Sequence, residues 1–403
     1  MKRIRIACLG QDLSGGGAER VQLELLKRLD RDSFSIDLCY LRDRGDLYDL
    51  VPADLVPVFF SPGQLPFKEG VCSAFKKYKA IARNADVLFG MMDGIPIYLA
   101  SLVGWLEDKA SIGWVHNTTS ICFKDCNHLH RYLAPIFYPR ASQLVSVSNG
   151  ARDDLRHLYK FKGAQPATIY NPIDVDRVRD LATESLPAGL APWYDKPVVI
   201  GVGRLCAQKR FDYLIRAFAA EISNGLDANL VLVGQGELLE PLKGLADQMN
   251  VASRVLFAGF HANPYPLIKA ATVLVLTSAF EGLGNVLLES MGVGTAVLSV
   301  DCPSGPREIL EGGKNGVLVP VDEIDALGSG IQTLLGNEPV RKNYVARGLR
   351  RVEEFSAARA VLQFEEMFRA LVRTKNASAH DRPNLSQTSA AMPSSSMPKD
   401  IQL

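Results

Sequence analysis

The chain has 403 residues, of which 47% are hydrophobic and 22% are charged, a composition typical of a folded globular protein and far from disordered or collagen-like chains. Its length suits two domains, since domains usually have roughly 100 to 200 residues. Lysine and arginine number 45 and aspartate and glutamate 44, so no overall basic field indicates nucleic-acid binding, and any contact with phosphate or membrane has to come from local patches.

The first ten residues, MKRIRIACLG, predict a first strand. Arg3 and Arg5 interrupt its apolar run, which is too short for the hydrophobic region of a signal peptide. The seven cysteines are an odd number, and most lie in apolar runs, as Cys8 and Cys39 do, which is typical of buried and reduced thiols. We therefore expect a cytoplasmic protein.

Short runs rich in valine, isoleucine and leucine alternate with helical patterns along both halves of the chain. Near-continuous apolar strands of this kind belong to parallel sheets that are covered by helices on both faces. The predicted strands are 4–9, 36–41, 56–60, 87–89, 111–115 and 144–148 in the first half, and 198–202, 230–233, 255–257, 273–277, 296–300 and 317–319 in the second. The fold class is therefore α/β, with two Rossmann-like, doubly wound domains of parallel sheet facing across a cleft.

The stretch 87–106 has the composition nearest to that of a membrane span. Asp93, Gly94 and Pro96 lie at its centre, however, and a charge at the centre of a membrane helix costs about 2.5 to 3.5 kcal/mol. We interpret this stretch as a strand, a turn and a buried helix.

A proline-rich connector divides the chain. Pro172, Pro187, Pro192 and Pro197 fit neither a central strand nor a helix interior, so the segment that holds them predicts a hinge between the domains. The predicted organisation is an N-terminal domain in 1–171, a C-terminal domain in 172–354, a closing helix in 355–374 that packs back on the N-terminal domain, and a disordered tail in 375–403, rich in serine, alanine and proline.

The loops after strands are where chemistry is expected. In an open parallel sheet, ligands bind at the carboxyl ends of the strands, where helix N-termini present free N–H groups to phosphate. After the first strand comes QDLSGGGAERV, in which Gly15, Gly16 and Gly17 allow a close approach of backbone to a ligand. A flexible turn is the alternative, because neither the Gly-x-Gly-x-x-Gly spacing nor a Walker lysine is present.

The first strand of the second half is followed by a basic loop, GVGRLCAQKRF, that contains Arg204 and Lys209. Two cations in one strand-to-helix loop can share a diphosphate, since charge-assisted hydrogen bonds are worth roughly 1.5 to 3 kcal/mol each. The alternative is a loop whose charges are solvated.

A third segment, LTSAFEGLGNVLLESMGVG, carries two acids. Glu281 follows a strand, Gly282 and Gly284 permit close backbone approach, and a helix beginning near Asn285 carries Glu289 in its early turns. One carboxylate then lies beside a phosphate-binding turn and the other within reach of a ribose, as in dinucleotide folds. An acid that only compensates the helix dipole is the alternative.

Together these segments resemble the family 4 retaining glycosyltransferases of the GT-B fold, from the GGAERV loop to the closing helix. The family's two glutamates, separated by seven residues, stand here as EGLGNVLLE from Glu281 to Glu289, preceded by GRL…QKR and VLFAGFHANPY. The segment SVDCPSGPREIL looks like the subgroup that assembles bacterial surface polysaccharides and protein-linked glycans, often from hexosamines. The resemblance implies an N-terminal acceptor domain and a C-terminal domain for a nucleotide-sugar donor.

The resemblance also implies a role for each matching residue. Arg204 and Lys209 would hold the donor diphosphate, Glu289 would bind the ribose hydroxyls, and Glu281 would face the donor sugar. The further donor contacts would come from Gly16, Gly17, Gly203, Leu283, Gly284 and Asn285.

His116, in SIGWVHNTTS, matches a histidine that lies beside the donor sugar in relatives, so it joins the expected catalytic residues. Many relatives follow this histidine with an acid, whereas Asn117 stands here. A histidine with a purely structural role is the alternative.

The mechanism that the resemblance implies is substitution on one face of the sugar, with the leaving phosphate accepting the acceptor's proton while Arg204 and Lys209 neutralise its charge. No metal and no other cofactor is then expected.

Asp174 and Asp176 imitate the metal-binding Asp-x-Asp of other transferases but lie in the connector. The cysteines and histidines of one further cluster match no standard zinc-finger spacing, and we interpret them as incidental: Cys122, Cys126, His128 and His130.

The expected reaction is transfer of a hexose or N-acetylhexosamine from a nucleotide diphosphate sugar, most simply a UDP-sugar, to a glycan or polyprenyl-linked acceptor. A nucleotide-sugar epimerase of the same fold and a non-catalytic nucleotide-sugar binding protein are the alternatives. The spacing of Glu281 and Glu289 together with the basic loop favours transfer over epimerisation. A binding protein would be expected to have lost Arg204, Lys209 or Glu281, and all three are present.

The segment FKEGVCSAFKKYKAIAR predicts a basic amphipathic helix. Apolar residues at helical spacing lie beside basic ones: Val71, Ala74, Phe75, Tyr78, Ile81 and Ala82 beside Lys68, Lys76, Lys77, Lys79 and Arg83. This pattern predicts reversible attachment of the N-terminal domain to the inner face of the cytoplasmic membrane, where a lipid-linked acceptor would lie. The alternative is that the apolar stripe packs on the domain's own sheet.

Overall fold

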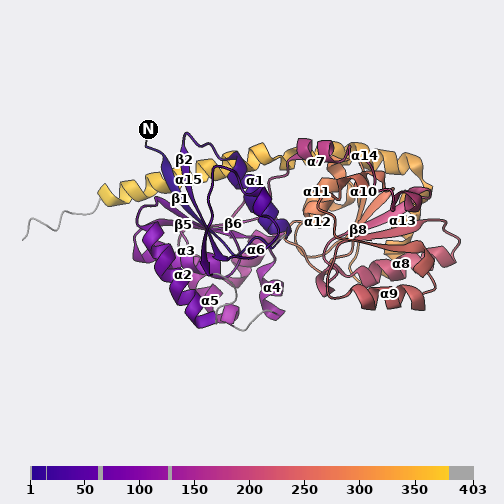
Figure 1. Cartoon of the computed structure of the whole chain (residues 1–403), viewed down its shortest axis with the longest axis horizontal. Coiled ribbons are helices and arrows are strands. Elements are labelled where there is room, and N and C mark those ends of the chain that lie inside the picture. Colours follow the sequence, from indigo (N-terminus) through magenta and orange to yellow (C-terminus); the bar gives the residue numbers. More distant parts are fainter. Residues whose placement is uncertain (1, 15, 62–66, 126–128, 381–403) are drawn as a thin grey trace, which may run out of the picture.

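The computed structural model describes residues 2–14, 16–61, 67–125 and 129–380. Figure 1 shows two α/β units side by side, each built on a parallel sheet with helices around it. The predicted fold class, two Rossmann-like domains of parallel sheet, is confirmed.

The N-terminal sheet has seven strands in the order β3-β2-β1-β4-β5-β6-β7, all parallel. The strands are β1 Ile4–Gly10, β2 Phe34–Arg42, β3 Val58–Ser61, β4 Val87–Gly90, β5 Ala110–Val115, β6 Gln143–Ser146 and β7 Ala167–Thr168. The helices are α1 Gly17–Arg28, α2 Phe67–Ala82, α3 Ile95–Leu106, α4 Thr119–Asp125, α5 Leu129–Phe137 and α6 Asn149–Leu158. The central strands β4 and β5 are buried along their whole length, which explains their unbroken apolar sequences.

The stretch 87–106 forms strand β4 and helix α3, as its sequence predicts. Asp93 and Gly94 form the turn between them, and Pro96 lies in the first turn of α3, where its missing N–H costs no hydrogen bond. Throughout the described ranges, no helix combines the length and the apolar character needed to cross a bilayer.

The C-terminal sheet has six parallel strands in the order β10-β9-β8-β11-β12-β13. They are β8 Val198–Val202, β9 Asn229–Val233, β10 Val255–Gly259, β11 Val273–Leu276, β12 Ala296–Val300 and β13 Val317–Val319. The helices are α8 Phe211–Ser223, α9 Leu239–Gln248, α10 Tyr265–Ala270, α11 Asn285–Gly292, α12 Pro306–Ile309, α13 Ile324–Gly336 and α14 Glu338–Arg351, with α7 Val175–Leu181 in the connector.

The chain crosses between the domains twice, and the two crossings pair with each other. Ile173, on the way out, and Ser356, on the way back, form a parallel β-bridge. Its hydrogen bonds run from the Ile173 N–H to the Phe355 carbonyl (3.2 Å) and from the Ala357 N–H to the Ile173 carbonyl (3.0 Å). The hinge is therefore a two-stranded link.

After the second crossing, helix α15 (Ala357–His380) runs back along the N-terminal domain (Figure 1, yellow). Phe364 and Phe368 are fully buried there. The ring of Phe364 lies 4.7 Å from that of Trp114, and the ring of Phe368 lies 5.9 Å from that of Phe34. Helix α15 thus completes the core of a domain whose other elements precede it by about 200 residues.

The closing helix is longer than its sequence pattern predicts. It continues to His380, and Lys375 forms an ion pair with Asp108 of the N-terminal domain at 2.8 Å. Residues 375–380 are therefore helical, and the predicted start of the disordered tail at residue 375 was wrong. The helix extends beyond its apolar stripe, and the sequence pattern showed only the stripe. Residues 381–403 lie outside the described part of the chain.

The apolar stripe of α2 faces its own sheet. Ala74, Tyr78 and Ala82 are buried, and the Tyr78 hydroxyl donates to the Ala7 carbonyl at 2.9 Å. For these residues the alternative interpretation of the amphipathic pattern is confirmed. Lys76 and Lys77 remain exposed, and the side chain of Lys68 is outside those described.

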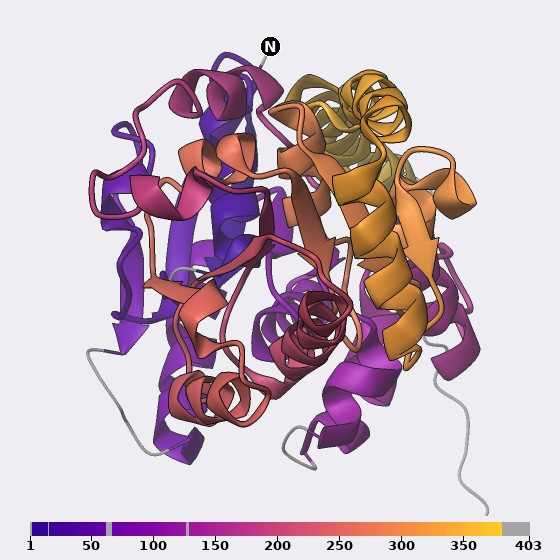
Figure 2. The ribbon, with the colours of Figure 1, turned by 90° about the vertical axis from the view of Figure 1, so that its right-hand side faces the viewer.

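The carboxyl edges of the two sheets face each other, with the C-terminal domain in front of the N-terminal one in Figure 2. Thr118, after β5, donates its hydroxyl hydrogen to the Glu281 carbonyl (2.9 Å). Glu308 of α12 accepts from the N–H groups of Asn149 (2.8 Å) and Gly150 (2.7 Å), where α6 begins. The loops in which the sequence predicts chemistry therefore meet at this boundary.

Candidate functional site

An ion pair between Lys209 and Glu281 lies at the centre of the C-terminal half of the site. The Lys209 Nζ is 2.6 Å from the Glu281 Oε1, and the Ser278 hydroxyl donates to the same oxygen at 2.6 Å. The Glu281 residue is only 7% exposed. A charge buried to this degree needs its partners, so the pair fixes the position of the ammonium group as well as that of the carboxylate.

The loops after β8 and β11 are joined by further hydrogen bonds. The Thr277 hydroxyl donates to the Lys209 carbonyl (2.8 Å), and the Gln208 side chain donates to the Phe280 carbonyl (3.0 Å). Because β8 and β11 are neighbours in the sheet, their loops end side by side. The structure thus brings together Lys209 and Glu281, which are 72 residues apart in the chain.

The glycines of the EGLGN segment are required by close packing. A Cβ atom on Gly282 would lie 1.7 Å from the His116 carbonyl oxygen of the N-terminal domain. Gly284, with φ of +92°, precedes α11 in the left-handed conformation. Leu283 is buried, so its backbone alone is available to a ligand. The free N–H groups where α11 begins at Asn285 thus lie at the domain boundary.

Glu289, one turn into α11, is a half-buried acid that lies near groups from both domains. Burial raises its pKa from 4.5 to about 6, against the effects of Arg20 of α1 and of a hydrogen bond with Tyr265 of α10. Glu289 in turn raises the pKa of Tyr265. A carboxylate held between a cation and a phenol is suited to accepting hydrogen bonds from hydroxyl groups.

Arg204 is exposed, and within the described residues its guanidinium has no ion pair. Glu19 of α1 lies near enough for Arg204 to lower its pKa, although burial raises that pKa overall. The Glu19 carboxylate folds back over the glycine loop, since a Cβ on Gly16 would lie 2.2 Å from its Oε2. Arg204 is therefore a cation on the boundary that is free to meet a ligand's anion.

The remaining glycines lie beside these groups. A Cβ on Gly17 would lie 3.9 Å from the side-chain nitrogen of Asn285, so the glycine loop faces the N-terminus of α11. A Cβ on Gly203 would lie 3.2 Å from the Cε of Lys209, so this glycine leaves room for the lysine. Gly15 lies outside the described residues.

His116 is a buried and neutral histidine. Its ring packs at a tilt against that of Trp114, its Nε2–H donates to the Met91 carbonyl at 3.0 Å, and burial lowers its pKa from 6.5 to about 4. With Nε2 as the donor, Nδ1 is left as a hydrogen-bond acceptor.

Asp93, in the turn after β4, supplies a carboxylate next to His116. It accepts hydrogen bonds from the His116 backbone N–H (3.0 Å) and from the Asn117 side chain (3.2 Å). Burial raises the pKa of Asp93 from 3.8 to about 6, although both bonds oppose the rise. Position 117 holds an asparagine, and the turn after β4 brings the Asp93 carboxylate to its side chain.

The weaker metal motifs have other partners. Asp174 caps α7 through the Arg177 N–H and pairs with Arg28, while Asp176 lies 3.6 Å from Arg179. In the cluster of cysteines and histidines that was interpreted as incidental, His130 forms a hydrogen bond through Nδ1 with the Tyr98 hydroxyl. Cys126 and His128 of the same cluster lie outside the described residues. Among the residues that are described, no three acids, cysteines or histidines gather as metal ligands would.

Four residues at the boundary were not identified from the sequence: Asp93, Glu19, Arg20 and Tyr265. Asp93 follows a strand, where chemistry is expected, but its charge was used only as an argument against a membrane span. Arg20 and Tyr265 lie in unremarkable helical patterns. The packing of α10 on α11 brings Tyr265 to Glu289, and the docking of the two domains brings Arg20 there.

Two family models match, one to each half of the chain. The model for Glycosyltransferase Family 4 matches residues 15–177, and the model for Glycosyl transferases group 1 matches residues 186–351. Together they span both of the domains described above.

Individual relatives agree with the family models. A Campylobacter jejuni enzyme, N-acetylgalactosamine-N,N'-diacetylbacillosaminyl-diphospho-undecaprenol 4-alpha-N-acetylgalactosaminyltransferase, is 30% identical over 85% of this chain and 93% of its own length. The lipopolysaccharide core biosynthesis glycosyltransferase LpsE of Rhizobium meliloti is 34% identical over 38% of this chain and 44% of its own. Among solved structures, Anabaena HepE in complex with UDP-glucose superimposes with a TM-score of 0.75 at 20% identity, over 91% of this chain and 100% of that one.

Replacing Glu289 with glutamine is expected to stabilise the ligand-free chain at neutral pH. The folded chain holds the Glu289 proton more tightly than the unfolded chain does, so stability falls as the pH rises from 4.5 to about 6 and the full cost is present above that. Urea unfolding near pH 7.5 should therefore show the variant more stable by about 1 to 2 kcal/mol.

The gain should shrink as the pH is lowered toward about 5, where part of the wild-type Glu289 is protonated. Glu366→Gln, which removes an exposed acid from α15, is the matched control and should show no such dependence. A gain of equal size at both pH values would contradict the assignment of the cost to ionised Glu289.

Proposed function

The chain belongs to the family 4 glycosyltransferases of the GT-B fold, and from this we propose that it transfers a hexose or N-acetylhexosamine from a UDP-sugar to a glycan or polyprenyl-linked acceptor. The observation that carries the proposal is the Lys209–Glu281 pair, which places a fixed cation and a fixed carboxylate at the boundary between the domains. The named activity of the Campylobacter relative, transfer of N-acetylgalactosamine to a diphospho-undecaprenol glycan, supports the choice of sugar and acceptor. The UDP-glucose bound by Anabaena HepE supports the choice of nucleotide.

The donor diphosphate, in this proposal, lies between the basic loop and the N-terminus of α11. Arg204 and Lys209 pair with its oxygens, and the backbone of Leu283, Gly284 and Asn285 donates to sugar and phosphate. Gly16, Gly17 and Gly203 allow this close approach. The lysine needs little reorganisation, because its pair with Glu281 already holds it in place.

The two glutamates of the motif then have different tasks. Glu289 accepts hydrogen bonds from the ribose hydroxyls, for which its position between Arg20 and Tyr265 is suited. Glu281 faces the sugar ring, next to His116, whose free Nδ1 accepts from a sugar hydroxyl. Asp93 orients the loop that carries His116 through its bond to the His116 N–H.

We propose that the reaction retains the configuration of the sugar. The bond from the anomeric carbon to the diphosphate oxygen breaks, the acceptor oxygen bonds to the same face of that carbon, and the acceptor's proton passes to the departing phosphate. Arg204 and Lys209 offset the charge that develops on the phosphate, so these side chains supply what a metal ion supplies in other transferases. Retention from an alpha-linked donor sugar gives an alpha linkage, which is the linkage named for the Campylobacter relative.

Attachment to the inner face of the cytoplasmic membrane is part of the proposal, although the apolar stripe of α2 is used within the domain. Lys76 and Lys77 of this helix are exposed, although the Lys77 ammonium also donates to the Phe60 carbonyl at 2.7 Å. Each basic residue near an anionic surface contributes about 1 kcal/mol, and this attraction needs no apolar insertion. The proposed attachment is therefore electrostatic and reversible.

We expect Lys209→Ala and Glu281→Gln each to reduce transfer to background for different reasons. The lysine variant should lose affinity for free nucleoside diphosphate, by roughly tenfold or more, because a charge-assisted bond is removed. The glutamine variant should keep most of that affinity, because Glu281 faces the sugar and the amide oxygen of glutamine can still accept from Lys209. Calorimetric titration with UDP separates the two, and wild-type affinity in the Lys209 variant would show that its assigned role is wrong.

We expect transfer to proceed at its full rate in excess EDTA. The proposed charge stabilisation comes from side chains and from the N-terminus of α11, none of which a chelator removes. Release of UDP from the donor, followed with and without EDTA, measures this. A complete loss of activity that Mg²⁺ or Mn²⁺ restores would refute the metal-independent mechanism.

The products formed from the donor without acceptor distinguish transfer from epimerisation. Formation of an epimerised donor would favour the epimerase alternative.

We expect the chain to sediment with anionic vesicles but not with neutral ones at low salt, and to be released at high salt. Lys76→Glu with Lys77→Glu should abolish sedimentation. The matched control is Lys243→Glu with Lys342→Glu, which changes the net charge equally on the C-terminal domain. Equal loss in both double variants would show that overall charge, rather than α2, determines binding.

A further inference from the structure

The N-terminus of α6 is capped from both domains. Its N-cap residue Ser148 binds the Ala151 N–H through its side chain at 3.1 Å, within the N-terminal domain. The N–H groups of Asn149 and Gly150 are bound instead by the carboxylate of Glu308, at 2.8 and 2.7 Å, from α12 of the C-terminal domain. A helix N-terminus has free N–H donors and a partial positive charge, and a carboxylate satisfies both. Separating the domains would leave these two N–H groups to water.

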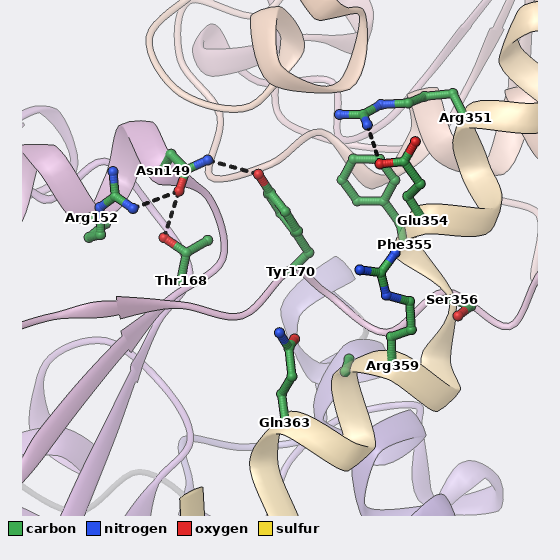
Figure 3. A pocket seen from close by; sticks show the side chains of 11 residues that line it. Asn149, Arg152, Thr168, Tyr170, Arg351, Glu354, Phe355, Ser356, Arg359 and Gln363 are labelled. Carbon is green, nitrogen blue, oxygen red and sulfur yellow. Dashed lines mark hydrogen bonds and ion pairs between the residues drawn. The ribbon is translucent and has the colours of Figure 1, made fainter. Parts of the chain in front are cut away.

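The same carboxylate is bound by the outgoing crossing of the hinge. The Tyr170 hydroxyl donates to the Glu308 Oε2 at 3.1 Å and accepts from the Asn149 side chain at 2.8 Å. The Tyr170 ring packs edge-on against that of Phe355 on the return crossing, with the ring centres 4.8 Å apart. Figure 3 shows Tyr170 lying between Asn149 and Phe355. Glu308 is therefore bound where the chain crosses between the domains, so its contacts bear on the angle between them.

Helix α12 is fixed within the C-terminal domain. Arg351, at the end of α14, donates to the carbonyls of Glu308 (2.9 Å) and Ile309 (3.2 Å). The Arg351 guanidinium is itself paired with Glu311 (3.1 Å) and Glu354 (2.6 Å), which holds it in place. The position of the Glu308 carboxylate therefore follows that of the whole C-terminal domain.

The segment that leads into α12 supports Glu281. The Glu281 N–H donates to the Pro303 carbonyl at 3.2 Å. Ser304 has a φ of +66°, a left-handed conformation that is strained for a residue with a side chain and persists where neighbours hold it. Its hydroxyl lies 2.8 Å from that of Thr118 in the N-terminal domain. One short segment, 303–308, therefore links the angle between the domains to the position of Glu281.

We propose that Glu308 is a positioning residue for transfer, which holds the domains at the angle at which Lys209 and Glu281 meet His116 across the boundary. Glu308 is not among the residues assigned to the donor, so it acts through α6 and through segment 303–308. Weakening its contacts lets the domains separate, which spoils the alignment that the reaction needs and leaves each half of the site intact. The inference rests on the proposed function for the reaction that it serves, whereas the domain angle can be measured without any substrate.

Small-angle X-ray scattering of the ligand-free full chain tests the domain angle. Glu308→Gln removes the negative charge and places an NH₂ group opposite one of the two N–H donors, with almost no change in volume. We expect a larger radius of gyration than in the wild type. Glu240→Gln is the matched control, because this exposed acid pairs with Lys243 of its own helix α9, and it should scatter like the wild type. Tyr170→Phe, which removes a single bond to Glu308, should give an intermediate value.

Kinetics with a UDP-sugar separate positioning from binding. Release of UDP from UDP-N-acetylgalactosamine, with water as the acceptor, should show kcat lowered about tenfold in Glu308→Gln, as loss of a charge-assisted bond does. UDP affinity, measured by calorimetry, should change little, because Arg204, Lys209 and Glu289 all belong to the C-terminal domain. Glu240→Gln should match the wild type in both measurements.

An unchanged radius of gyration in Glu308→Gln would overturn the inference whatever the kinetics, and so would a kcat equal to that of the wild type. A loss of UDP affinity as large as the loss of kcat would also overturn it, since Glu308 would then support the nucleotide site itself. A wild-type chain that releases no UDP from any UDP-sugar would refute the proposed function instead. The scattering of Glu308→Gln would still decide whether Glu308 sets the domain angle.

Discussion

Glu281 is held from both domains, and the arrangement of the site depends on it. Its carboxylate is bound by Lys209 and Ser278 of the C-terminal domain, while its carbonyl accepts the hydroxyl of Thr118 from the N-terminal domain. The next residue, Gly282, packs against the carbonyl of His116 with no room for a side chain. One short segment therefore sets the position of the charged pair, the beginning of α11 and the contact between the two sheet edges.

The fold could be predicted to a large extent because parallel strands buried on both faces leave long apolar runs in a sequence. Strand β7 (Ala167–Thr168) was missed, since two residues make no run. The pattern of α2 correctly indicated an apolar stripe, but a stripe does not show what covers it. In the structure the domain's own sheet covers the stripe, and the Tyr78 hydroxyl donates to the carbonyl of Ala7 in that sheet.

The candidate site could be predicted only where its residues follow strands. The loops with Lys209 and Glu281 were identified because carboxyl ends of neighbouring parallel strands share one edge. Arg20 and Tyr265 approach Glu289 from two helices in different domains, and no local pattern encodes that meeting. Asp93 shows the same limit within one domain, because its pairing with Asn117 joins two strand ends 24 residues apart.

The return of α15 to the N-terminal domain has a consequence for how the chain folds during synthesis. The C-terminal domain is a continuous stretch that can close its core as soon as its last strand and helices leave the ribosome. The N-terminal domain emerges first but lacks Phe364 and Phe368, which fill the space against Phe34, Phe89 and Trp114. Until helix α15 has been synthesised, the aromatic surface of the N-terminal domain that receives these two rings stays exposed. The N-terminal domain therefore completes its folding after the C-terminal domain.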